Sequence, residues 1–199
     1  MRTSLIINTA ALDPFVAPIT SMYAHSPYSV RAGYLRDIIL PAARKDGWDE
    51  IIVCGTFEEG EGYQYVPMEP IYRDRRDALW QREYGARHAT GDILAFSHDD
   101  HMFEEGILSV LPNLESWDIL VPGRRTRGGT VLNNGKAESY MGGHSLFMKR
   151  TIWAKAPWTS VDTEWWDRTM TRVWREEGAR IVWTEQAWHV DLDEPTLTD

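Results

Sequence analysis

Four consecutive polar residues, His98, Asp99, Asp100 and His101, follow an apolar run that is typical of a buried strand. Two carboxylates between two imidazoles supply the oxygen and nitrogen ligands that hold a divalent cation, and such a cation can neutralise a phosphate group. A simpler interpretation is that the chain turns here and Asp100 caps the N-terminus of the next helix. The elements around these residues bear on the choice between the two interpretations.

The composition is that of an ordinary globular domain. The 199 residues suffice for one domain, and 43% of them are hydrophobic and 26% charged. A formal charge of -9 argues against general binding to polyanions such as nucleic acid. No apolar run approaches the roughly 20 residues that span a bilayer. The single cysteine, Cys54, cannot form an internal disulfide, so we expect a reducing, cytoplasmic setting.

Apolar runs alternate with amphipathic segments along the chain. The runs predict strands at 3–9, 50–57, 63–68, 92–97, 117–123, 145–150 and 180–190, and the periodic segments predict helices at 30–45, 73–91, 103–114 and 163–179. Residues 10–29 are predicted to form a long loop, and residues 123–136 a basic, glycine-rich loop. This alternation predicts an α/β fold: a single Rossmann-like domain over 1–199, with a mostly parallel central sheet and helices on both faces.

Polar residues end three of the predicted strands. Asn8-Thr9 ends the first, Gly55-Thr56 the second, and His98-Asp99-Asp100 the strand after the long charged helix. Ligands bind beyond the carboxyl ends of the strands in sheets of this kind. We therefore expect the three groups to meet along one edge, which favours the ligand-binding interpretation of the acidic residues.

The stretch REYGARHATGDILAFSHDD, residues 82–100, resembles the core signature of family 2 glycosyltransferases with the type-A fold. The family pattern is Arg-Asn-x-Gly-x-x-x-Ala-x-Gly-Asp, a hydrophobic strand, and an acidic "DxD" cluster. The matching residues are Arg82, Gly85, Ala89, Gly91, Asp92, Asp99 and Asp100. Two positions depart from the pattern: Glu83 stands at the asparagine, and His98 stands at the first acid of the cluster.

Further family motifs follow in the expected order, so the resemblance spans about residues 3–190. A glycine pair precedes a strand in MGGHSLFMKR, and Asp167 and Gly178 have the family spacing on the last predicted helix. Trp166 replaces the first acid of that helix. A histidine near the end of the domain, His189, matches a position that type-A enzymes often use as a metal ligand.

The resemblance implies metal-dependent transfer of a sugar from a nucleotide-diphosphate sugar to an acceptor hydroxyl, with inversion. Asp100 and His189 are expected to hold Mn²⁺ or Mg²⁺, and His98 is either a third ligand or a hydrogen-bond partner of Asp100. Asp167 is the expected general base, and Glu164, on the same helical face, is the alternative. The acceptor is a saccharide, a protein or modified DNA.

Donor-binding residues are expected around the same edge. Asp99 supports the metal or contacts the ribose. Arg82 is suited to a forked contact with phosphate or base. The basic loop is either a lid over the diphosphate or an exposed hairpin. The complete set of expected donor-binding residues is Thr9, Thr56, Arg82, Asp99, Arg124 and Arg125.

Three other classes of protein fit parts of the pattern. A nucleotidyltransferase would carry a glycine-rich, basic loop after its first strand, but NTAALDPFVAP has no glycine, lysine or arginine. A metallo-phosphoesterase would need more histidine and aspartate ligands. An inactive sugar-binding, nucleotide-binding or assembly protein on the same fold would explain the departures at His98 and Trp166.

Overall fold

The computed structural model describes residues 1–9, 28–69, 75–113, 116–132, 145–161, 163 and 166–192. Its strands are β1 (Thr3–Thr9), β2 (Glu50–Gly55), β3 (Gln64–Pro67), β4 (Ile93–His98), β5 (His101–Phe103), β6 (Ile119–Thr126), β7 (Val131–Leu132), β8 (Leu146–Lys149) and β9 (Ile181–Asp191). Its α-helices are α1 (Tyr28–Tyr34), α2 (Leu40–Asp46), α3 (Arg75–His88), α4 (Ile107–Val110), α5 (Arg150–Lys155) and α6 (Trp166–Glu176). A π-helical turn, η1 (Leu35–Ile39), joins α1 to α2, and 3-10 turns form η2 (Leu111–Asn113) and η4 (Trp158–Ser160).

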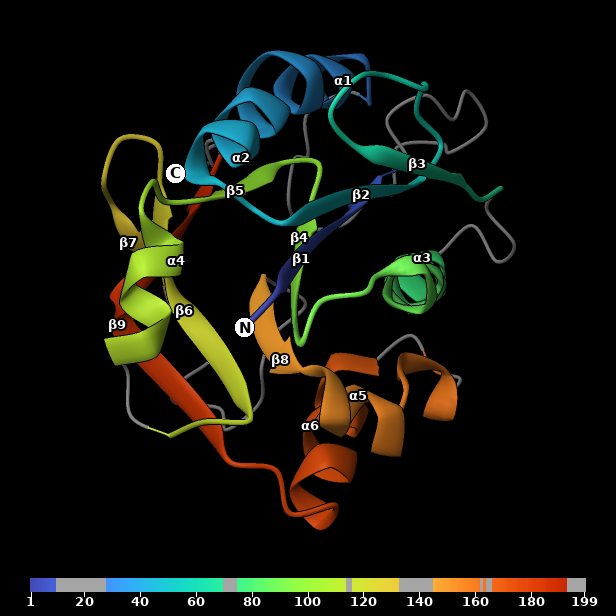
Figure 1. The fold of residues 1–199 in the computed structure, drawn as a ribbon, viewed down its shortest axis with the longest axis vertical. Helices are drawn as coiled ribbons and strands as arrows, with labels where there is room; N and C mark the ends of the chain where they lie inside the picture. Colours follow the sequence, from blue (N-terminus) through green and yellow to red (C-terminus); the bar gives the residue numbers. More distant parts are fainter. Residues whose placement is uncertain are drawn as a thin grey trace, which may run out of the picture.

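The strands form one sheet in the order β3-β2-β1-β4-β8-β6-β9-β5, with β7 paired to β6 (Figure 1). The strands β3, β2, β1 and β4 are parallel to one another. Beyond them, β8 is antiparallel to both β4 and β6, and β9 is parallel to β6. The carboxyl ends of β1, β2, β4, β6 and β9 therefore point the same way, which brings residues far apart in sequence to one edge.

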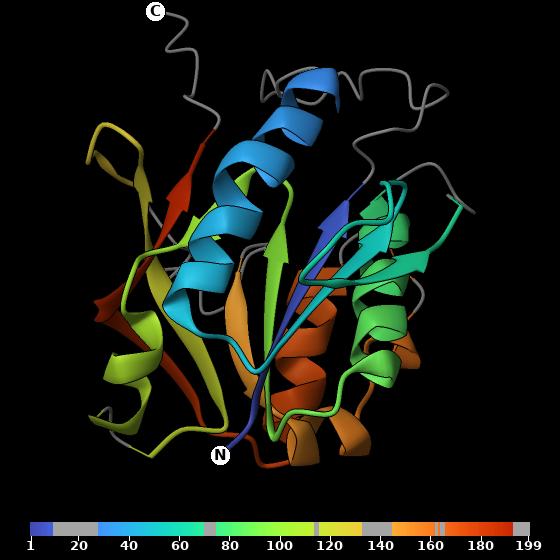
Figure 2. The ribbon, with the colours of Figure 1, turned by 45° about the horizontal axis from the view of Figure 1, so that its top comes forward.

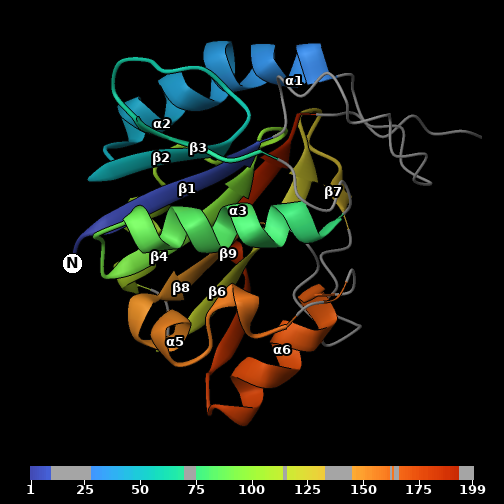
Figure 3. The same ribbon diagram turned by 90° about the vertical axis from the view of Figure 1, so that its right-hand side faces the viewer.

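Helices cover both faces of this sheet (Figures 2 and 3). On β1, Leu5 and Ile7 pack with α1, α2 and α4, whereas Ile6 faces α3, α5 and α6. Alternate residues of a strand point to opposite faces, so a strand covered on both sides is apolar throughout. This double burial explains why β1, β2 and β4 are continuous apolar runs in the sequence.

The expected α/β architecture with a largely parallel sheet and helices on both faces is confirmed. The short strand β3 lies at the edge of the sheet, as its proline indicates. Two elements, β5 and α5, were not expected. The basic segment is the β6–β7 hairpin as far as Leu132, which agrees with the hairpin interpretation over that part. Residues 10–27 of the expected long loop, and 133–136 of the basic loop, lie outside the described residues.

A glycine of the family signature allows α3 to pack closely on β1. A Cβ atom added at Gly85 would lie 2.4 Å from Ile6 Cγ2, in the middle of the core. We expect Gly85→Ala to lower the free energy of unfolding by about 1–3 kcal/mol, because the contact forces the helix away from the strand. Urea denaturation measures the change.

The matched control is Gly33→Ala in α1, where the nearest atom to the added Cβ is Asp37 Oδ2 at 3.9 Å. Alanine favours the helix by up to about 1 kcal/mol relative to glycine, so this variant should be as stable as the wild type or slightly more stable. Equal losses in the two variants would contradict the packing explanation.

Candidate functional site

The acidic pair occupies a two-residue turn between β4 and β5, and both carboxylates bind Arg31 of α1. Asp99 accepts hydrogen bonds from Arg31 Nη1 at 3.1 Å and from the Thr9 hydroxyl at 2.8 Å. Asp100 accepts one from Arg31 Nη2 at 2.7 Å. The capping interpretation of Asp100 is wrong, because α4 begins after Gly106 and has no side-chain cap.

His98 contacts Arg82 and Asn8. Its Nε2 lies 2.7 Å from Arg82 Nη2, and its Nδ1 lies 2.8 Å from the side-chain amide of Asn8. A guanidinium can only donate, so Nε2 accepts and the proton of the neutral ring is on Nδ1. The Asn8 amide then presents its oxygen to Nδ1, an orientation that also satisfies this otherwise unbonded buried oxygen. Both ring nitrogens of His98 are thereby engaged, so the structure does not bring it into a metal site as predicted.

A second group of ligand-type side chains lies on β5 and β9. His101 pairs across the strands with Asp191, and its Nε2 is 3.0 Å from Asp191 Oδ1. His189 lies two residues earlier on β9, on the same face, and its Nε2 is 3.6 Å from the same oxygen. We call His101, His189 and Asp191 the His–His–Asp cluster; one ligand atom from each lies within 4.8 Å of the others.

The protonation states of His189 and Asp191 suit metal ligands, whereas His101 must release a proton to bind a metal. Burial opposes the charged form of His101, but the Asp100 and Asp191 carboxylates outweigh it and raise the pKa of His101. Burial lowers the pKa of His189 to about 4, so this ring is neutral at pH 7. Burial also disfavours the charged Asp191, but the hydrogen bond from His101, with His189 and Arg124 nearby, holds the pKa of that carboxyl well below its usual range. A neutral imidazole and an ionised carboxylate are the forms that bind a metal.

The geometry of the cluster fits a divalent transition metal. Ligand atoms about 2.1–2.2 Å from a metal lie roughly 3 Å apart in neighbouring positions, so the contacts at the cluster require little rearrangement. Two nitrogens and one oxygen suit Mn²⁺ better than Mg²⁺, which prefers oxygen. Of the two predicted metal ligands, His189 belongs to this cluster. Asp100 lies beside it, with its carboxylate 3.8 Å from His101 Nδ1.

The buried guanidinium of Arg82 lies under an aromatic cover. Its Cζ is 5.0 Å from the Trp158 ring and 4.9 Å from the Trp166 ring. Burial lowers the pKa of Arg82 to about 9, and the charge of Asp167 opposes that change. Asp167 lies in the first turn of α6 and is itself buried. Arg82 therefore binds His98 and interacts electrostatically with Asp167, and its contact with a donor stays a prediction.

The other predicted site residues lie at the ends of β1 and β2, on β6, or outside the described residues. The Thr56 amide donates to the Thr9 carbonyl at 3.1 Å, which places both threonines at the expected edge. Arg124 donates from Nε to Asp191 at 2.8 and 3.0 Å, and Arg125 pairs with Glu104. Glu164 lies outside the described residues.

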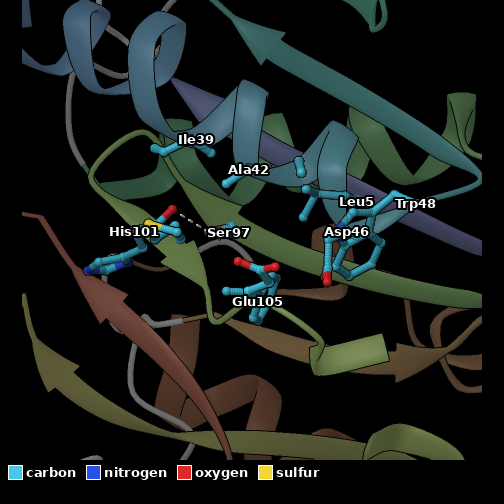
Figure 4. A pocket seen from close by; sticks show the side chains of 11 residues that line it. Leu5, Ile39, Ala42, Asp46, Trp48, Ser97, His101 and Glu105 are labelled. Carbon is cyan, nitrogen blue, oxygen red and sulfur yellow. Dashed lines mark hydrogen bonds between the residues drawn. The ribbon is translucent and has the colours of Figure 1, made fainter. Parts of the chain in front are cut away.

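A small pocket lies behind the cluster, under α2 (Figure 4). Its lining includes Leu5, Ile39, Trp48, Ser97 and His101. Its volume of about 20 Å³ has room for a single water molecule, so it is not a nucleotide pocket. The Ser97 hydroxyl donates to the His101 carbonyl at 3.1 Å, which fixes the start of β5 from this side.

Comparison with solved structures identifies the fold. S. aureus TarS superposes with a TM-score of 0.58 at 10% identity, over 94% of this chain and 36% of that one. TarS 1-349 in complex with UDP-GlcNAc gives a TM-score of 0.56 at 10% identity, over 98% of this chain and 60% of that one. This chain thus spans about a third of the longer TarS chain. The likeness confirms the type-A-like fold expected from the sequence, and at these identities it shows the fold alone.

Two further structures cover nearly the same length as this chain. Rv0371C of Mycobacterium tuberculosis H37Rv, in complex with manganese, gives a TM-score of 0.53 at 15% identity, over 98% of this chain and 94% of that one. The inositol-1-phosphate CTP transferase of T. maritima gives a TM-score of 0.54 at 12% identity, over 98% and 90%. No protein-family model and no curated protein sequence matches the chain. The architecture is one that nucleotide-utilising transferases share.

Membrane-spanning helices are not found in the described part of the chain, where each helix is too short or too polar to cross a bilayer.

Glu83 stands where the family signature has asparagine, and the structure gives this departure a role. Its Oε2 accepts hydrogen bonds from Trp153 Nε1 at 3.0 Å and from the Trp158 amide at 3.1 Å, and its Oε1 accepts one from Arg87 Nε at 2.8 Å. The carboxylate is buried and ties α3 to α5 and η4. It therefore holds Trp158 over Arg82.

We expect Glu83→Ala to lower the free energy of unfolding by about 2–4 kcal/mol, because the Trp153 indole N–H and the Trp158 backbone amide lose their acceptor inside the protein. Denaturant titration measures the loss. The control is Glu105→Ala, which removes an exposed pair with Lys45 and should cost no more than about 1 kcal/mol. Similar losses in both variants would contradict a structural role for Glu83.

Proposed function

We propose that the protein transfers a sugar from a nucleotide-diphosphate sugar to an acceptor hydroxyl. The observation that carries the proposal is the His–His–Asp cluster beside Asp100, at the carboxyl edge of the sheet. Two comparisons support it: the fold is shared with a protein that binds UDP-GlcNAc, and another protein of this fold binds manganese. The acceptor is a saccharide, a protein or modified DNA; the charge of -9 disfavours DNA.

The metal ligands in this proposal are His101, His189 and Asp191. A divalent ion bound there supplies positive charge to the leaving diphosphate. Arg124 holds the Asp191 carboxylate from β6, which fixes the direction of its oxygens toward the two imidazoles. Thr9 and Thr56, at the ends of β1 and β2, are the proposed hydrogen-bond partners of the nucleotide.

Asp167 is the proposed general base. The acceptor oxygen forms a bond to the anomeric carbon while the bond from that carbon to the diphosphate oxygen breaks, and the diphosphate leaves with the electron pair. The acceptor proton passes to the Asp167 carboxylate. Attack opposite the leaving group gives inversion. Arg82 positions Asp167 through its neighbouring charge.

Nucleotidyl transfer is the second candidate, because the T. maritima CTP transferase has the same fold over nearly its whole length. The two reactions release different products. Sugar transfer from a nucleotide-diphosphate sugar gives a nucleoside diphosphate, whereas nucleotidyl transfer from a triphosphate gives pyrophosphate. A protein that only binds sugars or nucleotides gives neither product.

The first test combines a thermal-shift screen of nucleotide sugars, with and without Mn²⁺, with product analysis for the donor that binds. We expect one donor to raise the melting temperature in the presence of Mn²⁺ and to yield a nucleoside diphosphate. Asp191→Asn should abolish the Mn²⁺-dependent shift. Pyrophosphate released from a triphosphate, with no reaction of nucleotide sugars, would instead establish nucleotidyl transfer.

The second test concerns the base. We expect Asp167→Asn to lower kcat by about 10²–10⁴-fold, since the acceptor hydroxyl loses its proton acceptor, while the Mn²⁺-dependent donor shift remains. Asp37→Asn, an exposed acid in η1, is the control and should retain full activity. If Asp167→Asn retains turnover and Glu164→Gln loses it, Glu164 is the base.

A further inference from the structure

The acidic pair that the family signature assigns to a metal already binds a cation of the protein. Arg31 spans the turn between β4 and β5, with Nη1 on Asp99 and Nη2 on Asp100. Thr9 provides a further donor to Asp99. The pair of carboxylates is therefore compensated from α1, by a residue far from the signature in sequence.

Because the contact between Arg31 and the two carboxylates is buried, it disfavours a second cation at the same pair. The side chains of Arg31, Asp99 and Asp100 are 13%, 4% and 9% exposed, so solvent screens their charges weakly. A divalent ion bound to Asp100 would lie close to the guanidinium on Oδ2, and the two positive charges would repel each other. The presence of one cation at the pair disfavours the other.

The His–His–Asp cluster differs from the Asp99–Asp100 pair in its ligand atoms, and this difference determines which cation each of them binds. A guanidinium forms paired hydrogen bonds with carboxylate oxygens, but it can donate only a single one to a neutral imidazole nitrogen, as Arg82 does to His98. A transition metal binds both kinds of atom. Arg124 also pairs with the buried Asp191, but here His101 and His189 add two nitrogen ligands that favour a metal.

We propose that Arg31 is the permanent cation of the Asp99–Asp100 pair and takes the place of the metal ion there. A divalent ion then binds at the His–His–Asp cluster and not at the pair. Arg31 is a positioning residue: it docks α1 onto the ends of β1 and β4 and presents a guanidinium, in place of a metal, on the side of the donor diphosphate. The last point rests on the proposed function.

The test counts Mn²⁺ ions bound per full-length chain by equilibrium dialysis, without any nucleotide. We expect one ion for the wild type and none for Asp191→Asn. In the Asp191→Asn background, Arg31→Ala should restore one ion, because two buried carboxylates lose their cation. Arg31→Lys in the same background is the matched control; it keeps the positive charge and should bind none. Circular dichroism verifies that each variant is folded.

Several outcomes would overturn the proposal. Two ions on the wild type, or one retained by Asp191→Asn, would mean that the pair accepts a metal with Arg31 in place. A folded Arg31→Ala, Asp191→Asn variant that binds none would mean that Arg31 does not replace a metal. If the double variant does not fold, the numbers of ions bound by the wild type and by Asp191→Asn decide whether the pair accepts a metal with Arg31 in place.

The result is distinguishable from the outcome for the proposed function. A wild type that binds no Mn²⁺ contradicts the metal at the cluster, and Arg31→Ala alone then tests Arg31 by whether it gains one ion. Product analysis with a donor decides the type of transfer, and it is independent of the number of Mn²⁺ ions bound without nucleotide.

Discussion

The Asp191 carboxylate is the contact on which the candidate site depends, because it joins three strands from distant parts of the chain. It ends β9, pairs with His101 of β5, and accepts both hydrogen bonds from Arg124 Nε of β6. An ionised carboxylate inside a protein is tolerated only when donors and opposite charges surround it. The three-residue strand β5 is also held by Phe103, which packs in the core against Trp48 and Phe147, so this contact and the core together fix the chain after β4.

Charges of alternating sign extend from that point across the carboxyl edge. Arg31 binds Asp99 and Asp100, and Asp100 lies 3.8 Å from His101. His101 in turn binds Asp191, and Asp191 also binds Arg124. Each buried acid thus has a cation or a hydrogen-bond donor beside it, on both sides of the β4–β5 turn. The network connects α1, the end of β4, and β6, so a change of charge at one end is felt by the ligand atoms at the other.

The sequence predicts those parts of the structure that local pattern encodes. Doubly buried strands are apolar runs and can be recognised, and so can the helix that ends in the family signature. The strand β5 is too short to leave a pattern. His101 and Asp191 are 90 positions apart and meet only through strand pairing, so the sequence indicated His189 but not its partners. The alternation of His189 and Asp191 on one strand is the signal that could have found Asp191. Arg31 lies in an ordinary amphipathic helix, and only its docking reveals its partners.

The same contacts bear on which transfer reaction the fold performs. A triphosphate carries more negative charge than a nucleotide-diphosphate sugar, and enzymes that use one need a basic, glycine-rich segment after the first strand. NTAALDPFVAP has no such residues. Arg31 and Arg124 are both engaged by buried aspartates, and Arg82 is enclosed by tryptophans, which leaves these three guanidinium groups poorly placed to compensate a third phosphate. A diphosphate needs less: one divalent ion at the His–His–Asp cluster, together with hydrogen bonds from the ends of β1 and β2, matches its charge. The charges at this edge are therefore consistent with the proposed transfer from a nucleotide-diphosphate sugar.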